Sequence, residues 1–222
     1  MSVGIAEIIE FYDNMLPVME QYHSSPNSRI EKTKSTLSNI THPGMSVLDV
    51  GCGTGILSKH LADIGASVTS IDISTKLVEY ARINSAHKNI VYMDGDICGY
   101  TSKKKYDIVV FSDVIEHIKP EELKSMLLRL SISNTHDKSV MYMNIPNKNF
   151  LKFMYENYPQ KLQIVDEAYS IGYITSLLSL CGFSPANIEI YGIDSNFQYN
   201  EYIFLKNEAF TVRYKEQLDS LM

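Results

Sequence analysis

The stretch Val47–Ser58, with the sequence VLDVGCGTGILS, constrains the fold of this chain more than any other. It opens with a short run that is apolar except for Asp49, which predicts a buried strand. After the glycines, Ile56, Leu57 and Leu61 recur at helical spacing. Glycines at alternate positions leave the backbone bare where the strand turns into the helix, so a ligand can approach the main chain there. We therefore expect a ligand-binding corner between a strand and a helix.

The glycines of this corner stand at positions 51, 53 and 55, which gives the pattern G-x-G-x-G. A dinucleotide-binding corner has the different spacing G-x-G-x-x-G, which disfavours a nucleotide-dependent oxidoreductase. Asp49 adds a carboxylate that would repel a pyrophosphate and suits an ammonium group. The pattern favours a ligand with a zwitterionic amino-acid end and a nucleoside end, and S-adenosylmethionine has both. A corner shaped by glycines for backbone geometry alone is the alternative.

With these residues, the stretch resembles motif I of the class I S-adenosylmethionine-dependent methyltransferases. The resemblance implies that Asp49, Gly51, Gly53 and Gly55 contact the cofactor, and it covers most of residues 44–206. Alternating strands and helices already indicate a doubly wound α/β fold. The resemblance implies a seven-stranded, mostly parallel sheet in the order 3-2-1-4-5-7-6. It implies one methyltransferase domain over residues 1–222, with an N-terminal helical lid at 1–43, a Rossmann-like core at 44–206 and a C-terminal helix at 207–222.

Asp72 ends the second expected strand and lies 21 residues after Gly51. At that distance a βαβ unit brings a second strand end beside the first, where a carboxylate can accept hydrogen bonds from both ribose hydroxyls. The alternative is that Asp72 or Ser74 only caps the helix predicted at Thr75–Asn84. We expect Asp72 to hold the ribose.

Further cofactor contacts come from the resemblance alone. It places a carboxylate at the adenine edge at Asp96, with the backbone of Ile97 beside the ring. Asp94 competes for this role, and the sequence D-G-D also suits an ordinary turn. The remaining cofactor contacts that the resemblance implies are Tyr22, Arg29, Ile73 and Ser112.

The apolar run YDIVVF predicts a strand at the centre of a parallel sheet, and it leads into the segment SDVIEHI. This segment resembles the fourth motif of the family, which lies next to the transferred methyl group. Because histidine can take a proton near neutral pH, we expect Glu116 and His117 to be catalytic, with His23 as a second candidate base. Alternatively, Asp113 and Glu116 have the spacing of a capping box, and His117 is a buried structural residue.

Asp113, Glu116 and His117 together read D-x-x-E-H, which is similar to a cluster in the ubiquinone-biosynthesis O-methyltransferases. Oxygen ligands with one imidazole could hold Mg²⁺ or Mn²⁺, so metal-assisted O-methylation of a quinone or catechol precursor is an alternative, although we assign no metal ligand. The likeness favours methyl transfer to a hydroxyl oxygen of a small-molecule acceptor, with S-adenosylhomocysteine as product. N-methylation of a small amine or amino sugar and a non-catalytic nucleotide-binding module are further alternatives.

The chain has 222 residues, 45% of them apolar, and a net charge of −6. It has no basic run longer than Lys103–Lys105, which disfavours a nucleic-acid partner. Its three cysteines form no C-x-x-C pair, which argues against a disulfide framework or a zinc site. No run approaches the roughly 20 apolar residues of a membrane span. We expect a cytoplasmic protein whose partner is a small-molecule acceptor, and the sequence does not indicate its oligomeric state.

Overall fold

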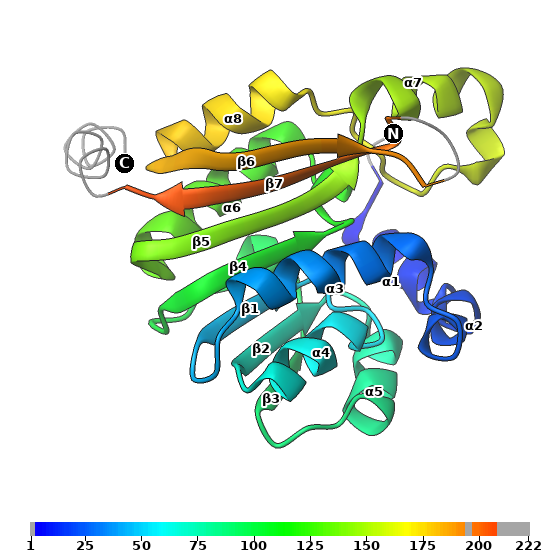
Figure 1. The fold of residues 1–222 in the computed structure, drawn as a ribbon. Helices are drawn as coiled ribbons and strands as arrows, with labels where there is room; N and C mark the ends of the chain where they lie inside the picture. The colour runs from blue at the N-terminus through cyan, green and yellow to red at the C-terminus, as the bar shows by residue number, and fades with distance from the viewer. Residues whose placement is uncertain (1–2, 194–196, 208–222) are drawn as a thin grey trace. The chain divides into compact units, whose positions relative to one another are not determined.

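The structure is a computed structural model that describes residues 3–193 and 197–207 (Figure 1). Across these residues, seven strands form one sheet in the order β3-β2-β1-β4-β5-β7-β6. The neighbours β1 and β2, β2 and β3, and β4 and β5 run parallel, whereas β7 runs antiparallel to both β5 and β6. The predicted α/β fold and strand order are confirmed. The chain divides into two compact units, Met1–Tyr100 and Thr101–Met222, which are described in turn.

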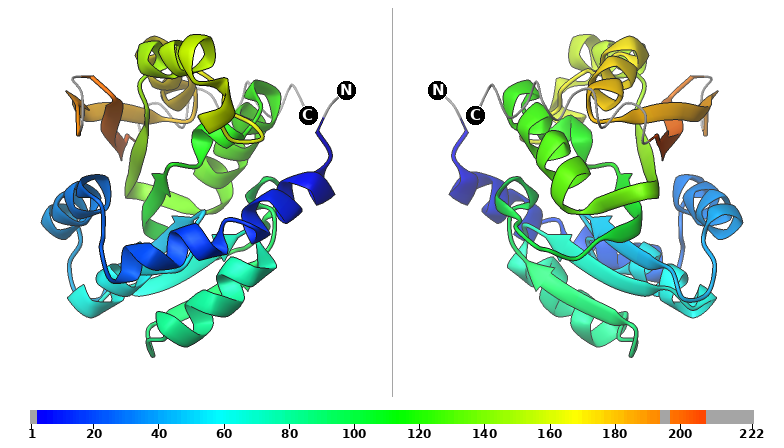
Figure 2. Two further views of the ribbon diagram at one scale, coloured as in Figure 1. Left: turned by 90° about the vertical axis from the view of Figure 1, so that its right-hand side faces the viewer. Right: turned by 90° about the vertical axis from the view of Figure 1, so that its left-hand side faces the viewer.

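The first unit carries the predicted ligand-binding corner. Its strands β1 and β2 are buried because parallel strands are covered by helices on both faces, and Val47, Leu48 and Val50 are at most 1% exposed. The edge strand β3 is more exposed. Within this unit α1 lies beside α5 (Figure 2). Its elements are α1 (Ile5–Asp13), α2 (Leu16–Met19), the 3₁₀ turn η1 (Glu20–His23), α3 (Ser28–Ile40), β1 (Ser46–Val50), α4 (Ile56–Ile64), β2 (Ser67–Asp72), α5 (Thr75–Asn84), β3 (Ile90–Asp94) and the 3₁₀ turn η2 (Ile97–Gly99).

The apolar pattern of the N-terminal region predicts a single helix over Ile5–Tyr22 that Pro17 kinks or breaks. The break comes earlier, at Asn14 and Met15, and Pro17 lies in the first turn of α2. A proline is tolerated in a first helical turn because its missing N–H would have no partner within the helix there. Pro17 therefore starts a helix here. The lid role of residues 1–43 stays a prediction.

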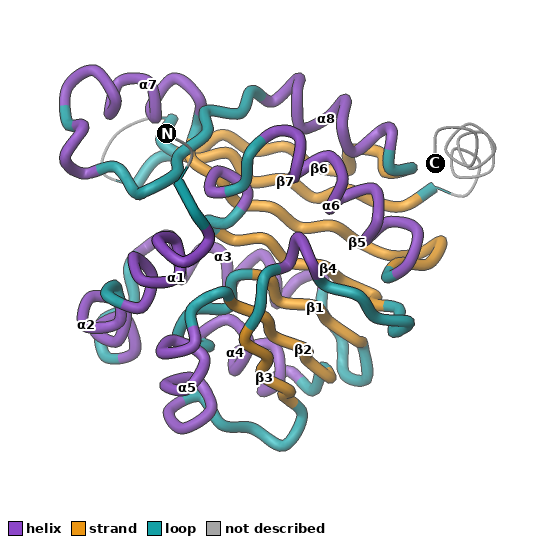
Figure 3. The backbone as a smooth tube through the Cα atoms, turned by 180° about the vertical axis from the view of Figure 1, so that it is seen from behind, coloured by secondary structure: helices purple, strands orange, loops and turns teal. Residues whose placement is uncertain are grey.

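The second unit contains an antiparallel hairpin beside a parallel strand pair. The helices α6 and α8 lie on the same face of these strands (Figure 3), and their buried residues include Leu127 and Leu178. Its elements are β4 (Tyr106–Ser112), the 3₁₀ turn η3 (Ile115–His117), α6 (Pro120–Ser133), β5 (Thr135–Pro146), α7 (Lys148–Asn157), the 3₁₀ turn η4 (Pro159–Lys161), α8 (Ile171–Leu180), β6 (Phe183–Tyr191) and β7 (Tyr199–Lys206).

Two strands of this unit begin four residues earlier than the apolar pattern predicts. The strand expected at Ser139–Ile145 begins at Thr135, and the strand expected at Asn187–Ile193 begins at Phe183. The residues added at 135–138 are polar, so periodicity does not reveal them. Those added at 183–186 include Pro185, where the strand register shifts, so the alternating pattern is interrupted there. The helix expected at Glu208–Leu221 lies outside the described residues. Within the described part of the chain, no helix has the length and apolar character needed to cross a bilayer.

Candidate cofactor corner and active site

The corner after β1 depends on backbone conformations that only glycine adopts readily. Gly51, Gly53 and Gly55 have φ values of +67°, +52° and +82°. At Gly55 a Cβ atom would lie 2.5 Å from the Tyr92 hydroxyl oxygen and 2.8 Å from the Ser85 Cβ. The start of α4 therefore packs against α5 and β3 only because position 55 carries no side chain.

The main-chain amides of the corner hold it onto the end of β2. The N–H groups of Gly51 and Cys52 both donate to the carbonyl oxygen of Ile71, at 2.8 Å and 3.2 Å. The N–H group of Gly53 donates to Asp72 Oδ2 at 2.7 Å. These three amides are directed at β2 and its carboxylate, so the corner offers a ligand its bare glycine backbone together with Asp72.

Asp72 is buried and oriented from two sides. Besides the Gly53 amide on Oδ2, its Oδ1 accepts a hydrogen bond from the Ser74 N–H at 2.9 Å. Burial raises the pKa of Asp72, whereas the N–H groups of Ser74 and Gly53 lower it. The Ile73 N–H also interacts with this carboxylate and lowers its pKa. The lone pairs that remain on the two oxygens can accept from a further donor. A carboxylate held in this way fits the two adjacent hydroxyls of a ribose, which is the fit that a nucleoside cofactor requires.

Asp49 is placed differently from Asp72. It is 2% exposed, and its Oδ2 accepts a 2.5 Å hydrogen bond from the Ser58 hydroxyl on α4, which in turn accepts one from Ser70. Burial raises the pKa of Asp49 to about 7, against the opposing effect of Ser58. Its side chain is hydrogen bonded to the helix, so this geometry favours a role in fastening α4 to β1. Direct contact with the cofactor stays a prediction.

The carboxylates that follow β3 separate into two environments. Asp94 accepts a hydrogen bond from the Arg82 guanidinium at 3.0 Å, and this interaction lowers the pKa of Asp94. Asp96 accepts from the Cys98 N–H at 2.8 Å and begins η2, in which Ile97 is buried. Because Asp94 is committed to Arg82, the geometry favours Asp96 over Asp94 for the adenine edge.

The remaining predicted residues of the first unit lie on its N-terminal helices or after β2. Tyr22 is half-buried on η1, Arg29 is half-buried on α3, and Ile73 is half-buried next to Asp72. His23 lies with its ring centroid 5.4 Å from that of Tyr80, and it hydrogen bonds the main chain of Thr54 in the corner. His23 therefore contacts the glycine corner through the main chain of Thr54.

In the second unit, β4 ends in a left-handed turn. Asp113 has a φ of +56°, a value uncommon outside glycine, and its N–H donates to the Asn144 carbonyl oxygen at 2.8 Å. Ser112 donates from its hydroxyl to Asp113 Oδ2 at 3.3 Å. Such conformations concentrate at functional sites, which agrees with the predicted position of this segment.

His117 is held between η3 and the loop at residues 162–170. Its Nδ1 lies 2.7 Å from the Val165 carbonyl oxygen and 3.3 Å from Asp166 Oδ1, and its Nε2 lies 3.8 Å from Glu116 Oε1. The loop is fixed to η3 at two further points: the Glu167 N–H donates to the Glu116 carbonyl, and the Tyr169 hydroxyl donates to the Ile118 carbonyl. The contact with residue 165, 48 positions away, is one that sequence spacing could not reveal.

The surroundings of His117 favour its charged form. Burial alone would lower its pKa, but the charge of Glu116 and the hydrogen bonds to Asp166 and Val165 raise the pKa of His117 to about 9. An imidazolium has no free lone pair to accept a proton, so this environment disfavours a base role at neutral pH. For His23, burial lowers the pKa, and the imidazole there is neutral at neutral pH. Within the described residues, no group of three or more His, Cys, Asp or Glu side chains is arranged to hold a metal ion.

Comparison with known proteins places this arrangement in a family. A family model for the methyltransferase domain matches residues 22–222. The chain belongs to the methyltransferase domain family. This confirms the resemblance to the class I S-adenosylmethionine-dependent methyltransferases that the glycine corner indicated.

Curated relatives of this methyltransferase match over part of its length. It is 33% identical over 119 residues to a protein named ubiquinone biosynthesis O-methyltransferase from Coxiella burnetii, covering 52% of this chain and 50% of that protein. It is 35% identical over 81 residues to the mitochondrial protein of the same name from Schizosaccharomyces pombe, covering 34% of this chain and 30% of that protein. The matched part thus spans half or less of each relative.

Solved structures match over more of the chain. The magnesium protoporphyrin IX methyltransferase of Synechocystis PCC 6803, solved with bound S-adenosylhomocysteine, has a TM-score of 0.66 and 25% identity, covering 80% of this chain and 82% of that one. An N-methyltransferase of Bradyrhizobium japonicum WM9 has a TM-score of 0.74 at 12% identity, covering 90% of this chain and 98% of that one, which shows a shared fold.

Proposed function

We propose that this methyltransferase transfers the methyl group of S-adenosylmethionine to a hydroxyl oxygen of a small-molecule acceptor. The part of the proposal that concerns the cofactor rests on the placement of Asp72. Its carboxylate is oriented by the N–H groups of Gly53 and Ser74, directly beside the bare glycine corner. Such a carboxylate suits the paired hydroxyls of the ribose, and the glycines of the corner add no side chain that would oppose the chain carried by the ribose.

The part of the proposal that concerns the methyl acceptor is supported by the names of relatives and by one sequence motif. The curated relatives that share 33% and 35% identity with part of the chain carry the name ubiquinone biosynthesis O-methyltransferase. The segment Asp113–His117 also has the D-x-x-E-H pattern of that group. Both point to oxygen rather than nitrogen as the methylated atom. The acceptor itself is proposed only as a small molecule that carries a hydroxyl group.

The cofactor would supply a methyl group on a sulfonium, which is already a good electrophile. The protein then needs to align the acceptor, exclude water and remove the hydroxyl proton as the oxygen–carbon bond forms. His23 has the protonation state that this last task requires, because its imidazole is neutral at neutral pH and it lies beside the corner. We propose His23 as the base, and we propose that His117 serves as a charged residue that fixes the loop at 162–170.

The direct test compares acceptors that differ in one atom. The purified chain is incubated with methyl-labelled S-adenosylmethionine and matched pairs of aromatic acceptors, one bearing a hydroxyl and the other an amine at the same position. We expect labelled methyl ether from the hydroxyl acceptors and S-adenosylhomocysteine in equal amount. Label on the amines alone would replace the proposal by N-methylation. Cofactor binding without turnover on any acceptor would favour a non-catalytic module.

The same assay tests whether His23 or His117 is the base. His23→Gln is expected to lower kcat by about 100-fold at pH 7.5, which is typical for loss of a general base. His117→Gln is expected to retain most of the turnover at saturating acceptor. The opposite ranking would return the base role to His117.

A further inference from the structure

The end of α1 is bonded to the same turn that orients the ribose carboxylate. Asp13 Oδ1 accepts a hydrogen bond from the Ser74 hydroxyl at 2.6 Å and from the Lys76 N–H at 3.2 Å. Ser74 is fully buried and also donates its own N–H to Asp72 Oδ1. One serine therefore joins two aspartates: its main chain holds Asp72 and its side chain holds Asp13.

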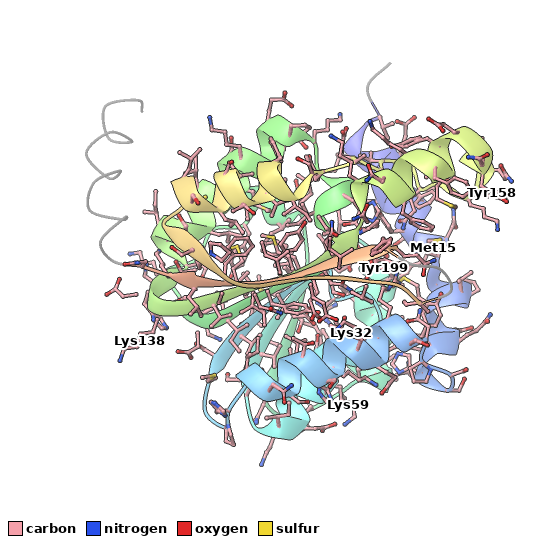
Figure 4. The ribbon with its side chains drawn as sticks, turned by 45° about the horizontal axis from the view of Figure 1, so that its top comes forward. Met15, Lys32, Lys59, Lys138, Tyr158 and Tyr199 are labelled. Carbon is pink, nitrogen blue, oxygen red and sulfur yellow. The ribbon has the colours of Figure 1, made fainter. Side chains whose placement is uncertain are left out.

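Residues 14–23, which contain α2 and η1, continue from Asp13 toward the glycine corner, and we call them the strap. Met15, at the start of the strap, is labelled in Figure 4. Farther along, a Cβ at Gly53 would lie 2.7 Å from the Met19 Cε, so the Met19 side chain rests on that glycine. At the end of the strap, His23 contacts Tyr80 and the main chain of Thr54. The strap thus touches both residues 53 and 54 of the corner.

The hydrogen bond between Asp13 and Ser74 links the strap to Asp72, the carboxylate proposed to bind the ribose. Asp13 marks the point where α1 ends, and the first helical turn of the strap begins three residues later, at Leu16. If the Asp13–Ser74 bond is lost, the strap loses its anchor on α5, and the turn from Asp72 to Ser74 loses a constraint. The charge of Asp13 also raises the pKa of Asp72, and ribose hydroxyl donors on Asp72 would favour its charged form.

We propose that Asp13 is a positioning residue for the ribose carboxylate, and that its bond to Ser74 couples the seating of the strap on the glycine corner to cofactor binding. The identity of the ligand rests on the function proposed above. The contact spans 61 positions of sequence, and no motif marks it.

The test uses three variants and the product of the proposed reaction. Titration calorimetry measures the Kd of S-adenosylhomocysteine for the wild-type chain, Asp13→Ala, Asp13→Asn and the control Glu10→Ala, which removes an equal charge from an exposed position of α1. We expect Asp13→Ala to raise Kd about tenfold, because a charge-assisted hydrogen bond is lost. Asp13→Asn keeps an acceptor oxygen and should stay within about threefold, and Glu10→Ala should bind like the wild type. Equal Kd values for Asp13→Ala and Glu10→Ala would overturn the proposal.

A double-mutant cycle with Ser74→Ala excludes a general loss of structure. Ser74→Ala removes the hydroxyl, and with it the cap on the Leu77 N–H of α5, but leaves the N–H that holds Asp72. The loss of the cap is common to the single and the double variant, so the cycle cancels it. If the two residues act as one unit, the double variant should bind no more weakly than the worse single variant. If the fold-increase in Kd of the double variant instead equals the product of the fold-increases of the two single variants, the coupling is contradicted.

Hydrogen exchange of residues 14–23 tests the strap without any ligand. We expect these amides to exchange about tenfold faster in Asp13→Ala than in Glu10→Ala. Equal rates would refute the anchor. This measurement also separates the two proposals: if the wild-type chain binds no S-adenosylhomocysteine, the proposed function fails, while the exchange rates still decide whether Asp13 holds the strap.

Discussion

Asp49 and Asp72 end neighbouring parallel strands, yet their carboxylates face different partners. Both residues are predicted as cofactor contacts from the sequence. The structure gives Asp72 two main-chain donors beside the glycine corner and gives Asp49 the Ser58 hydroxyl on α4. Residue type and spacing could place both carboxylates at the strand ends. They could not predict the direction of each side chain, because that depends on which donors the folded chain brings within reach.

The protonation of His117 should make the stability of the fold depend on pH, because its pKa of about 9 in the folded state exceeds the ordinary value of 6.5. A group with a raised folded pKa stabilises the fold fully below its unfolded pKa, and this contribution is lost as the pH rises through the folded pKa. We therefore expect the free energy of unfolding of the wild type, relative to His117→Gln, to fall by up to roughly 3 kcal/mol between pH 6 and pH 10.

Urea unfolding of both proteins at a series of pH values measures this difference. Subtracting the two curves removes the contributions of other groups, such as Lys206, whose pKa burial lowers to about 8. The difference should decline mainly between pH 6.5 and pH 9. A difference that does not change with pH would show that the contacts with Glu116, Asp166 and Val165 do not hold the imidazolium.

At the scale of elements, the strand, glycine turn and helix of the corner form a unit in which each glycine has its own task. Gly55→Ala would place a Cβ 2.5 Å from the Tyr92 hydroxyl oxygen at a φ of +82°. Backbone strain and overpacking together should lower the free energy of unfolding by about 3 kcal/mol. Gly53→Ala meets the flexible end of Met19 instead, at a φ of +52°, and should cost only about 1 kcal/mol while displacing the strap.

Gly99→Ala is the matched control for this pair, since a Cβ there has no atom within 4 Å. Its stability should lie within about 0.5 kcal/mol of the wild type in urea unfolding. Equal destabilisation by Gly53→Ala and Gly55→Ala would contradict the separate tasks of the two positions.

The elements themselves were largely predictable because apolar periodicity records burial. The parallel strands read as apolar runs, and α5 begins and ends where its cap residues indicate, with the Ser74 hydroxyl accepting from the Leu77 N–H. The strand start at Thr135 was missed because the residues that follow it are polar, and the start at Phe183 was missed because Pro185 interrupts the strand pattern beside a register shift. The break after Asp13 was also missed, because Pro17, where the break was expected, lies in the first turn of the next helix.

At the scale of the molecule, the sheet order followed from the family resemblance, and the structure confirms it. Contacts between distant segments had no counterpart in the sequence. The bond from Asp13 to Ser74 and the contact from His117 to Val165 span 61 and 48 positions, and neither Asp13 nor Val165 lies in a recognised motif. Both join a predicted site residue, or its neighbour, to a segment without a predicted role. Motif reasoning finds the residues that face a ligand more readily than the residues that hold them.

Calorimetric titration of S-adenosylhomocysteine into the wild-type chain and Asp72→Asn tests the central claim most directly. Asparagine keeps the shape of the side chain but replaces one oxygen, so it can no longer accept from both the Gly53 amide and the Ser74 amide while receiving two hydroxyls. We predict micromolar binding by the wild type and a Kd at least about 30-fold higher for the variant, corresponding to about 2 kcal/mol. Equal affinity of the two proteins, or no binding by the wild type, would contradict the account.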